Sequence, residues 1–331
     1  MCALPETYVP GFHDKNEVQK MKYIKFGDTD MNISQLSLGT AGFSYFFGGY
    51  DLEKCKATVH EAVKRGINFI DTAPFYGHGV SEEVLGKCLE GIPRKAYYLA
   101  TKVGRYEKDP KFMFDYSGKK TRESIEVSLK RLGVDYVDLL QVHSLEHANP
   151  DVVLNETLPV LEELRKQGKT RYVGVTSYPV SLLQDYLKKS TVKIDSVLSF
   201  TRLSLLNQTL REYIPFFQSK NVAIINAAPH CVGMLSSSGP PEWQRASQDI
   251  KDLCAEAREY CKKNDVEIGR LALYYALAQE GPHTILVGMN NTDILNINMD
   301  VMYNGLTDKE KKVYEHVKNN IMTKLSKTDW E

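Results

Sequence analysis

Short apolar runs recur along the chain, and a longer segment with helical periodicity follows most of them. The runs lie at 36–38, 69–70, 97–100, 137–142, 172–175, 196–200, 222–225 and 284–287. Each run is almost continuously apolar instead of alternating with polar residues, as expected of strands that are buried on both faces. The pattern therefore predicts a parallel sheet covered by helices.

The segments between the runs carry apolar residues at steps of three and four. Asp51 is expected to cap a helix whose apolar positions recur on one face, and Thr121 is expected to cap a second helix with a similar pattern. A third such pattern precedes Gly168. Gly66, Gly133 and Gly168 each stand between a helical segment and the next apolar run, as helix-ending glycines do. Eight such units over about 270 residues fit a closed (β/α)8 TIM barrel better than an open doubly wound sheet.

The remaining segments extend this barrel without adding a second domain. Residues 1–20 are polar and predict an irregular N-terminal arm, while 21–331 predict a single barrel domain. Residues 21–33 predict a β-hairpin that closes the bottom of the barrel. Residues 229–247, rich in Gly, Ser and Pro, predict an extended loop after the seventh strand, followed by helices at 248–263 and 267–279.

Charge and composition exclude several classes of partner. Lys+Arg and Asp+Glu are both 42, so the formal net charge is zero, and neither nucleic acid nor a membrane is expected as the main partner. The N-terminus lacks a signal-peptide pattern and no apolar run is long enough to span a membrane, so we expect a cytosolic protein. We expect a monomer or a weak homo-oligomer that acts on a small molecule.

Ionisable residues follow three consecutive predicted strands. Asp71 follows the second, Lys102 the third and His143 the fourth, and Tyr76 lies on the loop after Asp71. Since the strands of a (β/α)8 barrel end at the same rim, the four side chains are expected to lie together. Each also has a structural alternative: a turn cap for Asp71, a snorkelling lysine, a core histidine and a loop aromatic. An aspartate and a lysine at neighbouring strand ends favour the functional interpretation, because burying them apart is costly.

These groups could transfer a proton to or from a carbinol oxygen. A free phenol has a pKa of about 10, and a nearby ammonium group would lower that pKa. Asp71 would hold Lys102 charged, Lys102 would assist Tyr76, and His143 could orient the substrate oxygen. A redox carrier is still required. The His-Ser-Leu-Glu-His segment at 143–147 matches a zinc-peptidase pattern, but it follows a strand instead of lying on a helix, so we expect no metal site.

Several motifs together resemble the aldo-keto reductase family. They are Phe-Ile-Asp-Thr-Ala-x-x-Tyr-Gly at 69–77, Ser-Glu-x-x-Leu-Gly at 81–86, Ala-Thr-Lys-Val at 100–103, the strand-end His143, and Gly-Lys-x-Arg-Tyr-x-Gly-Val-Thr-Ser at 168–177. The resemblance implies that Asp71, Tyr76, Lys102 and His143 form a catalytic tetrad, with Tyr76 as general acid/base. It also implies a nicotinamide dinucleotide as hydride carrier.

Thr-Ile-Leu-Val-Gly-Met-Asn at 284–290 is similar to the branch of L-galactose and other aldose 1-dehydrogenases. Gly288 and Ile294 stand where NADPH-dependent members place a lysine and an arginine around the 2′-phosphate, which favours NAD, with NADP possible. Ala227 replaces the usual aromatic under the nicotinamide, and Tyr178 replaces an Asn. The resemblance implies cofactor contacts at Gly39, Thr40, Ser177, Ser199, Ala228, Gly288, Met289, Asn290 and Asn298.

Aromatic residues in two loops are candidates for the substrate pocket. Phe43 and Tyr45 follow the first strand, and Trp243 lies in the extended loop; a simply packed loop is the alternative. We expect an NAD(P)-dependent oxidoreductase, in the form of an aldose (L-galactose-like) 1-dehydrogenase. The alternatives are an NADPH-dependent aldehyde or ketone reductase and a non-catalytic cofactor-binding regulatory subunit.

Overall fold

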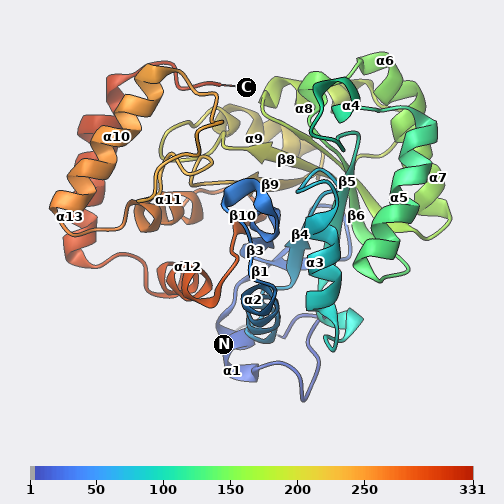
Figure 1. Ribbon diagram of the computed structural model, residues 1–331, viewed down its shortest axis with the longest axis horizontal. Helices are drawn as coiled ribbons and strands as arrows, with labels where there is room; N and C mark the ends of the chain where they lie inside the picture. Colours follow the sequence, from blue (N-terminus) through green and yellow to red (C-terminus); the bar gives the residue numbers. More distant parts are fainter. Residues whose placement is uncertain (1–3, 331) are drawn as a thin grey trace.

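Eight parallel strands close into a barrel in the computed structural model, which describes residues 4–330 (Figure 1). The strands are β3 (Leu36–Gly39), β4 (Phe69–Asp71), β5 (Tyr98–Val103), β6 (Val137–Val142), β7 (Thr170–Ser177), β8 (Ser196–Phe200), β9 (Ala223–Ala227) and β10 (Thr284–Gly288). The ring closes where β10 pairs with β3, with Ile285 opposite Leu36. The predicted (β/α)8 barrel is confirmed.

Helices surround the barrel (Figure 1). They are α2 (Leu52–Lys64), α3 (Val80–Leu89), α4 (Pro110–Met113), α5 (Gly118–Leu132), α6 (Pro150–Val152), α7 (Leu158–Lys166), α8 (Val180–Lys189), α9 (Leu210–Ser219), α10 (Gln248–Lys263), α11 (Ile268–Leu277), α12 (Thr292–Asn304) and α13 (Asp308–His316). Asp51 caps α2 as predicted, its side chain accepting from the Lys54 amide. The predicted cap of α5 is wrong: Ser117 accepts from the Lys120 amide, and Thr121 lies a turn inside the helix.

Alternation along the strands separates two packed layers. Ile70, Leu99 and Leu140 belong to the large core cluster that includes apolar residues of the surrounding helices. Phe69 and Tyr98, one residue earlier on their strands, belong to a second cluster. Because side chains alternate along a strand, Asp71, two places beyond Phe69, again points to the inside of the barrel. It lies at the carboxyl ends of the strands, the upper end of the barrel.

The predicted hairpin closes the lower end of the barrel. Strands β1 (Tyr23–Lys25) and β2 (Asn32–Ser34) pair antiparallel, with Ile24 opposite Ile33. Phe26, Met31 and Ile33 are fully buried in the same cluster as Phe69. The hairpin therefore supplies the apolar floor of the barrel.

The N-terminal segment is more ordered than its polar sequence suggests. It contains helix α1 (Lys15–Lys20), which Asp14 caps and whose Val18 is fully buried. Glu6 binds the Asn32 amide of the hairpin at 2.8 Å and also accepts a hydrogen bond from Tyr98. The irregular arm expected over 1–20 is thus, over its described part, packed on the bottom of the barrel.

The extended loop after β9 packs in a satellite core away from the barrel. Cys231, Met234 and Leu235 join apolar residues of α10, α11 and α13 in one cluster that also includes Trp330. The C-terminal tail runs to the loop after β8: Arg202 donates to the Trp330 carbonyl, and the Asn207 amide donates to Asp329 at 2.8 Å. The tail and the loop after β8 are therefore tied together.

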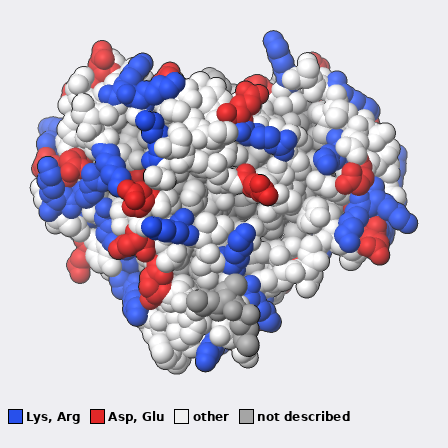
Figure 2. All heavy atoms as spheres, turned by 180° about the vertical axis from the view of Figure 1, so that it is seen from behind, with Lys and Arg blue, Asp and Glu red and all other residues white. Residues whose placement is uncertain are grey.

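The surface mixes charges of both signs. On the face shown in Figure 2, basic and acidic side chains are interspersed instead of gathering by sign. Within residues 4–330, no helix is long and apolar enough to cross a membrane.

Candidate active site

The carboxyl ends of β4 and β5 bring a carboxylate and an ammonium together inside the barrel. The Lys102 ammonium forms an ion pair with the Asp71 carboxylate and donates to the Thr72 carbonyl at 2.8 Å. Both side chains are 2% exposed. A buried pair of this kind is stable only when its remaining hydrogen-bonding capacity is satisfied, and here it is fixed from several sides.

Tyr76 reaches this pair from the turn that follows β4. Its amide bonds to the Ala73 carbonyl at 3.1 Å, and its own carbonyl accepts from the Ser81 amide at 3.1 Å, at the start of α3. Gly77 and Gly79 adopt positive φ angles of 64° and 99°, which make the sharp return into α3 possible. The Lys102 ammonium lies 3.4 Å from the phenol oxygen and 5.0 Å from the ring centroid.

Burial and charge act against each other in this group. Burial alone would lower the pKa of Lys102, but the Asp71 carboxylate and Tyr76 raise it above its ordinary value, so the ammonium stays charged. Burial raises the pKa of Asp71, and Lys102 opposes that shift. Burial also raises the pKa of Tyr76, and the opposing effect of Lys102 does not cancel it. The expected lowering by the ammonium is present, but desolvation is larger, so the direction expected from the sequence is reversed.

His143 stands beside the phenol at the end of β6. The rings of Tyr76 and His143 meet edge to face, with centroids 6.0 Å apart. Burial, together with the positive charges of Lys102 and Arg105, lowers the pKa of His143 well below its ordinary value. The imidazole is therefore neutral at neutral pH. Its Nδ1 is buried without a hydrogen-bond partner among residues 4–330, which leaves the ring available to a ligand.

Gln141 is a member of this site that the sequence did not indicate. Its amide nitrogen donates to the second oxygen of Asp71 at 2.8 Å, and the residue is fully buried. An amide within an apolar strand has no distinctive sequence signal. The alternation of β6, which places Gln141 and His143 on the same side, could have pointed to it.

The cofactor candidates on β7 and β8 present polar groups at the same rim. The Ser177 hydroxyl, at the end of β7, donates to Glu146 at 2.9 Å. Ser199, on β8, is fully buried, and its hydroxyl has no partner in the described part of the chain. Asn298, on α12, is 4% exposed with an unpartnered amide nitrogen. Unpaired buried groups such as these suit a polar ligand that would satisfy them.

The other cofactor candidates lie at the ends of β3, β9 and β10. Gly39 is paired with Gly288; a Cβ on Gly288 would meet only the Gly39 carbonyl oxygen, at 3.9 Å, whereas a Cβ on Gly39 would lie 3.4 Å from the Val287 carbonyl oxygen. The Thr40 hydroxyl lies 3.2 Å from the Asp71 carbonyl and 2.9 Å from Ser81, so its role is partly structural. Ala228 has a φ angle of 57°, and Met289 is buried while Asn290 is partly exposed just before α12.

The three aromatic candidates for the substrate pocket have different environments. Phe43 is fully buried in the main core, so it packs inside the protein instead of lining an open pocket. Tyr45 is 72% exposed, and its ring packs against that of Tyr50, with centroids 5.6 Å apart. Trp243 is 51% exposed and lies 6.3 Å, centroid to centroid, from Phe46.

Phe46 and Phe75 connect this aromatic group to His143. Their centroids lie 5.1 Å apart, and the Phe75 ring meets His143 edge to face at 6.2 Å. Aromatic side chains from the loop after β3, the turn after β4 and the extended loop therefore form a continuous apolar wall that reaches the candidate catalytic group. The sequence pointed to the loops but not to Phe75.

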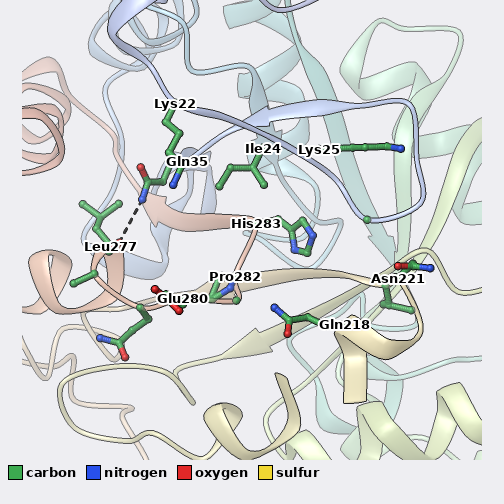
Figure 3. A pocket seen from close by; sticks show the side chains of 15 residues that line it. Lys22, Ile24, Lys25, Gln35, Gln218, Asn221, Leu277, Glu280, Pro282 and His283 are labelled. Atoms are coloured by element: carbon green, nitrogen blue, oxygen red, sulfur yellow. Dashed lines mark hydrogen bonds between the residues drawn. The ribbon is translucent and has the colours of Figure 1, made fainter. Parts of the chain in front are cut away.

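A pocket of about 660 Å³ lies at the opposite end of the barrel (Figure 3). Lys22 and Gln35 near the hairpin, Asn221 before β9 and His283 before β10 line it, and Gln35 donates to the Leu277 carbonyl at 3.3 Å across one side. None of the candidate catalytic residues lines it.

Comparisons with known proteins agree with this geometry. L-galactose dehydrogenase from Arabidopsis thaliana is 37% identical over 283 residues, covering 85% of this chain and 88% of that protein. D-arabinose 1-dehydrogenase from Saccharomyces cerevisiae is 29% identical over 292 residues, covering 82% and 85%. The solved holo form of the aldo-keto reductase AKR11C1 from Bacillus halodurans superposes with a TM-score of 0.72 at 31% identity, covering 90% of this chain and 96% of that one.

The match to the family extends over nearly the whole barrel. Residues 35–318 fit the sequence profile of the Aldo/keto reductase family, from the first barrel strand to beyond α13. The named relatives are dehydrogenases and reductases, so the match also establishes the type of reaction. This chain is an oxidoreductase and belongs to the aldo/keto reductase family.

Proposed function

We propose that this protein is an NAD-dependent aldose 1-dehydrogenase that oxidises a cyclic sugar at its anomeric carbon to a lactone. The observation that carries the proposal is the buried Asp71–Lys102 pair with its ammonium 3.4 Å from the Tyr76 phenol. This arrangement suits proton transfer at a carbinol oxygen and provides no nucleophile for acyl transfer. The resemblance to L-galactose dehydrogenase supports a sugar as the substrate.

In this proposal each residue has one task. Tyr76 reacts as the phenolate, whose negative charge Lys102 stabilises, and it accepts the proton of the anomeric hydroxyl group as the C–H bond of the anomeric carbon breaks. Asp71, held by Gln141, keeps Lys102 charged and in place. Neutral His143 orients the reacting oxygen by a hydrogen bond. A bound nicotinamide dinucleotide supplies the hydride acceptor.

The residues near α12 favour NAD over NADP. The loop and first turn, 288–297, contain no lysine or arginine, and Asp293 adds a negative charge there. Arg65 reaches α12 by a 2.7 Å bond to Asn296, but it is also shared with Glu17. A 2′-phosphate would need charge-assisted donors that this segment does not provide.

A substrate screen and one substitution test the proposal. We expect reduced nicotinamide to accumulate with aldoses and NAD, with kcat/KM at least tenfold higher than with NADP. Tyr76→Phe should lower kcat at least about 1000-fold while dinucleotide binding, followed by fluorescence, changes little. Tyr213→Phe removes a phenol from the outside of the barrel on α9 and should leave kcat unchanged. Unchanged turnover in Tyr76→Phe would contradict the mechanism and favour a non-catalytic cofactor-binding role.

One observation favours a second candidate, the reduction of an aldehyde or ketone. Burial raises the pKa of Tyr76, so the phenol remains protonated at neutral pH and is ready to donate. Faster turnover with aldehydes and NADPH than with aldoses and NAD in the same screen would select this alternative.

A further inference from the structure

Arg105 lies against the aromatic wall beside the catalytic group, and the proposed mechanism does not use it. It follows β5 by two residues, in a segment where it forms an isolated antiparallel bridge with Phe114. Its guanidinium carbon lies 3.7 Å from the centroid of the Phe75 ring and 5.3 Å from that of Phe114. Since Phe75 also contacts His143, the guanidinium is fixed next to the reacting group.

The guanidinium is unusually short of partners for a partly buried charge. Its Nε is buried without a hydrogen bond, and its Nη1 reaches the Ser144 hydroxyl only at 3.4 Å, in the described part of the chain. No carboxylate of residues 4–330 lies within 4.0 Å of it. Buried charges are normally paired or hydrogen-bonded, and a guanidinium is rigid enough to present its donors to oxygen atoms of a ligand.

A carboxylate with a free acceptor stands close to this donor. Glu146 follows Ser144 by two residues, and its Oε2 accepts from Ser177, whereas its Oε1 is buried without a partner within 4–330. Burial lowers the pKa of Arg105, and Tyr178 and the Glu146 carboxylate partly offset this shift, which places the two charges within electrostatic reach. The rim beside His143 therefore offers both a cationic donor and an anionic acceptor.

We propose that Arg105 and Glu146 recognise hydroxyl groups of the sugar ring, and that Arg105 is a specificity-determining residue. A hydroxyl group both donates and accepts, so Arg105 can donate to one sugar oxygen while Glu146 accepts the hydrogen of a neighbouring hydroxyl. A carboxylate substrate would be attracted by Arg105 but repelled by Glu146, which favours neutral sugars over uronic acids. This inference rests on the proposed aldose oxidation.

The test compares a sugar with an aldehyde that has no hydroxyl groups. Arg105→Met keeps much of the side-chain length and removes the donors. With the best aldose of the screen, kcat/KM should fall about 10- to 100-fold, mostly through KM, as expected for loss of hydrogen bonds from a charged donor. With propanal and reduced dinucleotide, the loss should be clearly smaller, within about threefold. Arg105→Lys should recover only part of the aldose activity, because an ammonium lacks the planar donor pair.

A matched control separates recognition from general effects of charge. Lys188→Met removes a cation that lies 5.3 Å from the Phe216 ring on the outside of the barrel, and it should alter neither activity. Equal losses with aldose and propanal in Arg105→Met would overturn the inference, since Arg105 would then act through Tyr76, whose pKa it lowers. Faster oxidation of a uronic acid than of the matching aldose by the wild type would overturn the preference for neutral sugars.

The same experiment distinguishes a failure of the proposed aldose oxidation from a failure of the inference about Arg105. If the wild type oxidises no aldose, the proposed function fails regardless of Arg105. The comparison of variant and wild type is then made in the reducing direction, with glyceraldehyde against propanal. A selective loss on glyceraldehyde would support hydroxyl recognition by Arg105, and equal losses would overturn it.

Discussion

The buried phenol of Tyr76 is the side chain whose chemistry depends most on its surroundings. Its pKa is raised by burial despite an ammonium at 3.4 Å. In the proposed aldose oxidation Tyr76 accepts a proton, so the oxidation rate should follow the fraction of Tyr76 that is phenolate. We expect kcat/KM for aldose oxidation to rise close to tenfold per pH unit from about pH 7 to about pH 10.

Initial rates over this range, with NAD at saturation, provide the measurement. Reduction should stay flat over the same range, because the phenol remains protonated below its raised pKa. A plateau of the oxidation rate beginning near about pH 8 would contradict the raised pKa.

The sequence identified charged and aromatic groups at strand ends, but not the balance of forces among them. Asp71, Lys102 and His143 could be predicted because polar residues that follow apolar strands are conspicuous. The net shift of Tyr76 could not, because its largest cause is burial by residues distant in sequence. Gln141 and Arg105 could not be identified from the sequence for a similar reason: only the folded barrel shows which atoms they face.

Close contact between two helices puts a strict limit on side-chain size at Gly86. In α3 this residue faces α5, and an added Cβ would lie 2.3 Å from the Arg131 carbonyl oxygen. Because that atom belongs to the backbone, the helices must move apart. We expect Gly86→Ala to lower the free energy of unfolding by about 1–3 kcal/mol, despite the better helix propensity of alanine.

Urea unfolding of the variant checks this expectation against Lys87→Ala, which changes an exposed neighbour on the same helix. The control should stay within about 0.5 kcal/mol of the wild type. A more stable Gly86→Ala would mean that the two helices can separate without cost.

Strands were predicted more reliably than helix ends. All eight barrel strands lie where apolar runs occur, because a strand that is buried on both faces consists almost entirely of apolar residues. The sequence does not fix the start of α5, because Ser117 and Thr121 are both acceptable N-cap residues. Which of them caps the helix depends on where the backbone first turns into the helical conformation. Helix α1 has one buried apolar residue, Val18, so it carried no periodic signal.

For the whole molecule, buried histidines predict sensitivity to acid. Burial lowers the pKa of both His143 and His230 below the ordinary value, so the unfolded chain binds more protons than the folded one as the pH falls below about 6.5. Both are neutral in either state at higher pH, where they contribute no pH dependence. Each should therefore reduce the free energy of unfolding by up to about 1.4 kcal/mol per pH unit below that point.

Unfolding by urea between about pH 5 and about pH 8 measures the slope. His143→Gln should flatten the slope on the acidic side, because it removes the histidine whose pKa burial lowers. An unchanged slope in His143→Gln would show that this histidine is protonated in the folded protein.

The contact between the C-terminal tail and the loop after β8 has a consequence for local unfolding. Arg202 and Asn207 hold the chain at 328–330, while Ser199, a candidate cofactor contact, lies just before the same loop. Removal of residues 326–331 should increase the rate of amide hydrogen exchange at 201–208, about tenfold for each 1.4 kcal/mol by which the free energy of local opening falls. The amides of β5 and β6 should stay protected. Proteolysis or a fusion at this end would then act on the rim of the active site, far away along the chain.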